Sequence, residues 1–181
     1  VGVIHPAASI VREKERGTLE QLLVAPISTF QLFLAKIAPT MIIGLLAVFP
    51  SLLIVRAFDV PMRGSLALFL ILTGFFLLSA VALGVLIAAY SRTLQQALLL
   101  SFFGLFPVMF LSGTLTPVEA MPDVLQALSR LSPLRYYMDI IIGVFLKGVG
   151  WRDLWDESLC LIAIAIPMLI LSLGIFRRRL Q

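Results

Sequence analysis

The sequence predicts an all-α membrane protein, a polytopic bundle of four spanning helices joined by short helical connections. Of its 181 residues, 60% are hydrophobic and 13% are charged, and the mean hydropathy is +1.06. Soluble domains are about half apolar and about one quarter charged, so a water-soluble globular fold is excluded. The apolar residues also form long runs between isolated charges, and several of these runs are long enough to cross a bilayer.

The opening residues 1–5 resemble the last turns of a membrane helix. No charged region precedes an apolar stretch there, so we expect no signal peptide. We therefore interpret residues 1–181 as one transmembrane domain, the C-terminal part of a longer chain with the end of a preceding span at its start.

The next element is a polar segment, residues 12–27, that we expect on the membrane surface. Its charges alternate through Arg16, then Gly17 breaks the helix and Thr18 can cap a new one. The leucines that follow recur at the helical period with Glu20 on the opposite face, and Pro26 ends the element. The pattern predicts a short amphipathic helix. From the residues alone it is either a plain interfacial linker or a docking surface for a cytoplasmic partner.

Four apolar runs qualify as spans: residues 37–55, 64–91, 93–113 and 158–176. Ser28 offers a cap for the helix that leads into the first of them. Four prolines inside the spans are expected to kink their helices. Two lie in the first span, one in the third and one in the fourth: Pro39, Pro50, Pro107 and Pro167.

Two side-chain patterns inside the spans carry predictions. Ala80, Gly84 and Ala88 recur every four residues, which predicts close helix packing, with a subunit-contact or gating face as the alternative. Phe102, Phe106 and Phe110 share a face of the third span. Ordinary packing or lipid contact explains that face, and a transport pathway for amphipathic compounds is the alternative.

The far-side segment, residues 114–157, is expected to hold short outer-leaflet helices. Thr116 and Glu119 fit a capping box with a helix through Leu128, and Ser132 with the following proline starts a second helix that ends near Lys147. Tyrosines and tryptophans of this segment suit the headgroup zone: Tyr136, Tyr137, Trp151 and Trp155.

Charge predicts the orientation and excludes several functions. An even number of spans returns the chain to its starting side, which carries eight basic and three acidic residues, against six and seven on the other side. Both ends of this segment are therefore expected in the cytoplasm. The net charge of +4 is scattered, which is unlike a nucleic-acid-binding patch. The single Cys160 and the single His5 exclude a disulfide framework and a paired-histidine metal site.

The sequence also lacks a phosphate-binding Gly-rich loop followed by Lys and Ser or Thr, so we expect ATP to be bound and hydrolysed elsewhere. The spans contain no Asp or Glu, which disfavours an ion-coupled mechanism and an intramembrane enzyme. We expect no catalytic residue, no metal ligand and no cofactor in this chain.

Two motifs resemble one family. Residues 15–26, with Glu15, Arg16, Gly17, Thr18 and Glu20, resemble the signature that follows the second span of ABC-2 type transporter permeases, with Ala25 where serine or threonine is common. The far-side segment is similar as well. Its matches are Ser112-Gly113, Pro117 with Glu119, Met121-Pro122 and Lys147-Gly148.

The resemblance implies a function. The five motif residues would belong to a coupling helix that docks on an ABC ATP-binding subunit, which binds ATP and Mg²⁺, and a second permease chain would complete a homodimer or heterodimer. The motif resembles multidrug-type exporters of bacterial inner membranes, so drugs or other amphipathic, lipid-like compounds are the expected cargo. The alternatives are polysaccharide or haem-related export, or a membrane scaffold or assembly protein without transport activity.

Overall fold

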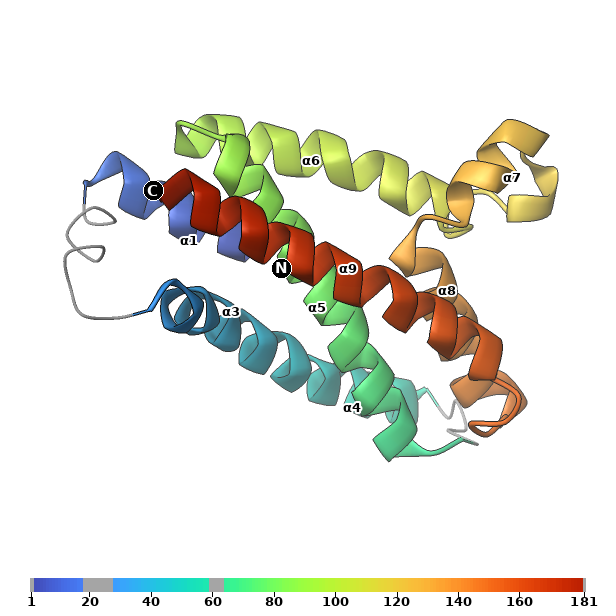
Figure 1. Ribbon diagram of the computed structural model, residues 1–181. Coiled ribbons are helices and arrows are strands. Elements are labelled where there is room, and N and C mark those ends of the chain that lie inside the picture. Colours follow the sequence, from blue (N-terminus) through green and yellow to red (C-terminus); the bar gives the residue numbers. More distant parts are fainter. Residues whose placement is uncertain (1, 18–27, 59–63, 181) are drawn as a thin grey trace. The chain divides into compact units, whose positions relative to one another are not determined.

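A computed structural model describes residues 2–17, 28–58 and 64–180, and within these ranges every regular element is a helix (Figure 1). The all-α prediction is confirmed. The longer helices are α1 (Ile4–Glu15), α3 (Thr29–Leu46), α4 (Val48–Ala57), α5 (Leu66–Tyr90), α6 (Leu94–Leu111), α7 (Asp123–Ser129), α8 (Pro133–Ile142) and α9 (Trp155–Leu180). A 3₁₀ turn (Val118–Ala120) precedes α7, and a π-helical turn (Gly143–Lys147) continues α8.

Four stretches of the described chain are long and apolar enough to cross a membrane: Phe30–Ala57, Leu66–Tyr90, Leu94–Leu111 and Trp155–Arg178. They confirm the four predicted spans. The first consists of α3 and α4, which are separated at Ala47. The break lies just before Pro50, which has no N–H to donate to the preceding turn. The other three span prolines lie inside continuous helices.

The first span begins several residues earlier than its apolar run. The Ser28 hydroxyl accepts a hydrogen bond from the Gln31 N–H (3.2 Å), and the Gln31 side chain accepts one from the Ser28 N–H (2.9 Å). This reciprocal pair is a capping box, which satisfies N–H groups that the first turn leaves without a helical partner. The predicted cap at Ser28 is confirmed.

The chain divides into two compact units. Unit 1 comprises residues 1–44, 77–104 and 166–181, and unit 2 comprises residues 45–76 and 105–165. The core of unit 1 is built from the end of α1, the start of α3, the end of α5, Ala97 of α6 and Phe176 of α9, which packs against the Phe33 ring at 5.6 Å.

The core of unit 2 forms where α8 packs on the first half of α5. The Tyr137 ring stacks on Phe76 with 4.2 Å between centroids, and its hydroxyl shares a 3.0 Å hydrogen bond with the Thr73 hydroxyl. The sequence predicts Tyr137 in the headgroup zone, and the structure adds this helix contact, which the sequence does not predict. Trp151 and Trp155 are exposed.

The extension of α8 stops where the sequence predicts. The π-helical turn finishes at Lys147, and Gly148 adopts a left-handed conformation (φ +66°) that only glycine adopts without strain. The Gly64 N–H donates to the Val144 carbonyl (2.9 Å), and a side chain at Gly64 would collide with that carbonyl.

The predicted helix from Thr116 to Leu128 is wrong. No side chain caps the 3₁₀ turn, and Met121 is extended (ψ 152°), so α7 begins only at Asp123. Pro122 is the reason, because a proline pushes the preceding residue out of the helical region. Within α7, Leu128 is exposed and Ser129 is buried.

Candidate functional site: the end of α1

The small-residue stripe of α5 lies against α1 in unit 1. A Cβ added at Gly84 would lie 2.3 Å from the Val3 carbonyl oxygen and 2.7 Å from the Pro6 Cγ. Ala80 and Ala88 are buried, at 9% and 0% exposed. The stripe therefore permits backbone approach between two helices of the same chain.

The last turn of α1 contacts three other helices through three consecutive side chains. Glu13 forms an ion pair with Lys36 of α3. The Lys14 ammonium donates to the Ala88 carbonyl near the end of α5 (2.5 Å). The Glu15 carboxylate accepts a hydrogen bond from the Leu94 N–H at the start of α6 (2.9 Å). We call the set Glu13, Lys14 and Glu15 the α1 clamp.

Each contact of Lys14 and Glu15 satisfies a helix end. The last carbonyls of a helix lack N–H partners and carry partial negative charge, so an ammonium near Ala88 is stabilising. The first N–H groups of a helix carry partial positive charge, so a carboxylate at Leu94 is stabilising as well. The two residues thus hold both ends of the tight turn at Arg92 between α5 and α6.

That turn is further ordered by its own side chains. The Thr93 hydroxyl accepts from the Gln96 N–H (3.2 Å), and the Gln96 side chain accepts from the Arg92 N–H (2.9 Å). The Ser91 hydroxyl donates to the Ile87 carbonyl (2.8 Å). The α1 clamp therefore holds a rigid corner.

Gly17 ends α1 directly after the clamp. Its φ of +67° is left-handed, and nothing lies within 4 Å of a Cβ placed there. Glycine is therefore favoured at this position by its backbone conformation, because a side chain would meet no neighbouring atom. Arg16 is exposed. Thr18 and Glu20, the other two predicted coupling residues, lie outside the described residues.

The structure gives Glu15 a contact that the motif does not predict. Its carboxylate faces α6 of the same chain. The sequence signal for the clamp is the alternation of charges just before Gly17, but the partners Lys36, Ala88 and Leu94 are far away in the sequence.

The phenylalanine face of α6 is largely uncovered by the described residues. Phe102 is 66% exposed and Phe106 is 60% exposed, while Phe110 is half-buried. Phe102 makes an edge-to-face contact with the neighbouring Phe103 at 5.9 Å. Of the predicted roles, lipid contact and a transport pathway both need such an uncovered face, whereas ordinary packing within the bundle does not.

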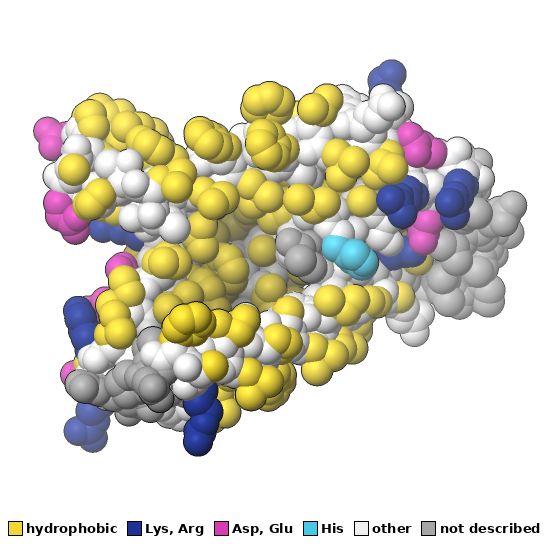
Figure 2. All heavy atoms as spheres, turned by 180° about the vertical axis from the view of Figure 1, so that it is seen from behind, with side chains coloured by type: hydrophobic (Ala, Val, Ile, Leu, Met, Phe, Trp, Pro, Cys, Tyr) yellow, Lys and Arg dark blue, Asp and Glu magenta, His cyan; other side chains and the backbone are white. Residues whose placement is uncertain are grey.

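His5 and the charged groups near it lie at the same part of unit 1. Figure 2 shows the single histidine beside a group of basic and acidic side chains, on a face that is otherwise mostly hydrophobic. The His5 Nδ1 shares a 2.8 Å hydrogen bond with the Thr40 hydroxyl of α3. Among the residues that the structure describes, no group of histidine, cysteine and carboxylate side chains could hold a metal ion.

The pKa of the Asp139 carboxyl in unit 2 is shifted from its ordinary value. Burial raises the pKa of the Asp139 carboxyl on α8, Arg135 opposes the rise and Glu157 adds to it. The α8 helix is not among the spanning helices.

The fold and the motif define a class of protein, a polytopic α-helical membrane permease domain. Residues 4–146 match the family model of the ABC-2 type transporter, and the chain belongs to that family.

Three of its relatives are permeases of Escherichia coli. The chain is 36% identical over 186 residues to the probable multidrug ABC transporter permease YbhR of Escherichia coli, a match that covers all of this chain and 50% of the relative. It is 34% identical to the permease YbhS (100% of this chain, 48% of the relative) and 29% identical to the inner membrane transport permease YhhJ (98% and 48%), both of Escherichia coli. The chain thus spans about half the length of these relatives. No solved structure matches it.

Proposed function

We propose that this chain forms the spanning part of the permease subunit of an ATP-driven exporter in a bacterial inner membrane. Membership of the ABC-2 family and the names of the multidrug relatives support the class. A separate ATP-binding subunit would bind ATP and Mg²⁺ and hydrolyse the ATP, and a second permease chain would complete the transporter. Drug-like or other amphipathic compounds are the proposed cargo.

The α1 clamp is the observation that carries the mechanism. It joins the last turn of α1 to α3, α5 and α6, at the point where the segment that resembles a coupling helix begins. A movement of that segment would pass through Gly17 to α1 and then to three other helices at once. We propose that Glu15 transmits this movement inside the permease and that Glu20 meets the ATP-binding subunit.

The same proposal includes the orientation of unit 1 in the membrane. The ends of α1 and α5 and the starts of α3 and α6 meet through the clamp, so they share one end of unit 1. We propose that this end faces the cytoplasm, because the basic residues concentrate in its connections and tail.

Two variants distinguish the transmission of movement by Glu15 from the docking of Glu20 on the ATP-binding subunit. Glu20→Arg should lose the ATP-binding subunit on co-purification. Glu15→Ala should keep that subunit but lose export and the stimulation of ATP hydrolysis by cargo, because the Leu94 N–H loses its acceptor. Glu119→Ala is the matched control, since it removes an exposed carboxylate from unit 2 and should leave both readouts unchanged. Wild-type export by Glu15→Ala would refute transmission through the clamp.

A further inference from the structure

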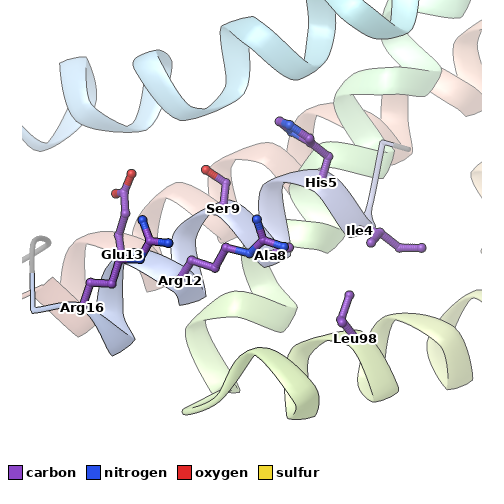
Figure 3. Close-up of a pocket in the computed structure, with 8 residues that line it drawn as sticks. All are labelled: Ile4, His5, Ala8, Ser9, Arg12, Glu13, Arg16 and Leu98. Atoms are coloured by element: carbon purple, nitrogen blue, oxygen red, sulfur yellow. The ribbon is translucent and has the colours of Figure 1, made fainter.

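A cavity of about 640 Å³ lies along the side of α1 that carries Arg12 and Arg16 (Figure 3). Its lining comes from successive turns of α1 and from Leu98 of α6, all within unit 1. The cavity is therefore a feature of one compact unit.

The lining changes in chemistry along its length. At the start of α1, Ile4 and Ala8 lie opposite Leu98, which points from α6 toward α1 in Figure 3. At the other end, Arg12 and Arg16 follow each other at a spacing of one helical turn. The distance along the helix from Ile4 to Arg16 is about 18 Å, at 1.5 Å per residue.

The two arginines are not compensated. Glu13, which also lines the cavity, is paired with Lys36, and the Glu15 carboxylate binds the start of α6. Neither the Arg12 nor the Arg16 guanidinium has a hydrogen-bond or ion-pair partner within the described part of the chain, and both side chains are exposed. Guanidinium groups bind phosphate and carboxylate through paired, charge-assisted hydrogen bonds.

We propose that this cavity binds an anionic amphiphile, with its phosphate or carboxylate on Arg12 and Arg16 and its apolar chain toward Ile4 and Leu98. A cationic ligand would meet two uncompensated positive charges. A small inorganic anion would leave the apolar end of the cavity empty.

Two sources supply this chemistry. Basic pockets between membrane helices bind anionic lipid headgroups. An anionic amphiphilic cargo of the transporter has the same groups. Binding itself does not depend on the proposed export function, so the two can be tested separately.

The binding test uses the purified protein with three probes: dodecyl phosphate, inorganic phosphate, and nanodiscs of phosphatidylglycerol compared with phosphatidylcholine. Dodecyl phosphate binding is measured by calorimetry, and retained phosphatidylglycerol by native mass spectrometry. The double variant R12Q/R16Q should bind both about a hundredfold more weakly, at about tenfold for each guanidinium that no longer donates to the anion. R12K/R16K keeps the charge without the paired geometry and should show a smaller reduction in affinity.

The matched control is R177Q/R178Q, which removes two exposed positive charges from the end of α9 in the same unit. It should bind like wild type. Equally weakened binding in R12Q/R16Q and R177Q/R178Q would overturn the site, because it would show only general attraction of anions. Inorganic phosphate binding as tightly as dodecyl phosphate, or no preference for phosphatidylglycerol, would overturn it as well.

The source is assigned in vesicles that contain the transporter with its ATP-binding subunit. ATP-driven movement of dodecyl phosphate that R12Q/R16Q abolishes, while the variant keeps its ATP-binding subunit and its rate of ATP hydrolysis, supports a cargo site. Binding without movement in wild type supports a lipid site. If the ATP-binding subunit fails to associate with wild type, the proposed function fails, and the binding measurements on the purified permease still decide whether the cavity holds an anionic amphiphile.

Discussion

Gly84 of α5 lies in close contact with the start of α1, and a single methyl group there tests the packing. In Gly84→Ala the new Cβ would lie 2.3 Å from the Val3 carbonyl oxygen, where ordinary van der Waals contact begins at 3.4 Å. The shortfall is 1.1 Å. The nearest atom belongs to backbone, so no side chain can rotate away, and α1 has to move as a body.

The expected cost follows from two opposing effects. Overpacking of a tightly packed contact costs about 1–3 kcal/mol. Replacing glycine by alanine inside a helix gains about 1 kcal/mol of helix propensity. We therefore expect Gly84→Ala to lower the free energy of unfolding by up to about 2 kcal/mol, the difference between these two effects. The shift of α1 should also lengthen the hydrogen bond from Lys14 to Ala88.

Gly74 provides the matched control on the same helix, because nothing lies within 4 Å of a Cβ placed there. Gly74→Ala should show the gain in helix propensity alone, about 0.5–1 kcal/mol. Unfolding of each variant by SDS titration, followed by the helical circular dichroism signal, measures both. If Gly84→Ala proved as stable as Gly74→Ala, the close approach of α1 to α5 would be refuted.

Three further outcomes are expected. Ser28→Ala should destabilise the start of α3 by about 1 kcal/mol because a first-turn N–H loses its acceptor, whereas Thr116→Ala should be neutral in the same assay. Wild type should lose stability as the pH rises above 3.8, the ordinary pKa of Asp139, because burial raises the folded-state pKa and the folded state holds that proton more tightly. Asp139→Asn should remove this loss, and an unchanged pH profile would contradict it. In a cysteine-free background on intact cells, an impermeant thiol reagent should label a cysteine at exposed Val124 and not one at exposed Gln95; the reverse pattern would invert the orientation.

Much of the fold could be predicted because it depends on local signals. Each span is an apolar run between charges, and a bilayer requires its backbone groups to bond within the helix. The end of α1 at Gly17, the cap at Ser28 and the end of the α8 extension near Lys147 all follow from the conformational preferences of a few adjacent residues.

The errors arise where one local signal opposes another, or where a partner lies far along the chain. The threonine and glutamate at positions 116 and 119 fit a capping box, but Pro122 determines the backbone there. Tyr137 contacts Phe76 and Thr73 of α5, which lie far away in the sequence, so its own neighbours along the chain do not indicate this contact. The Glu15 contact with Leu94 joins residues 79 positions apart, so no short motif indicates it.

The run from Arg12 to Arg16 shows how five adjacent residues serve several directions. Successive residues of a helix point about 100° apart, so the three clamp residues point to three different sides, and the two arginines share the remaining one. Three of those directions are occupied by α3, α5 and α6. A displacement of the end of α1 must therefore carry those helices along or break a polar contact, and a typical hydrogen bond contributes about 0.5–1.5 kcal/mol. Moving together is the less costly response, and it would also move the cavity that the two arginines line.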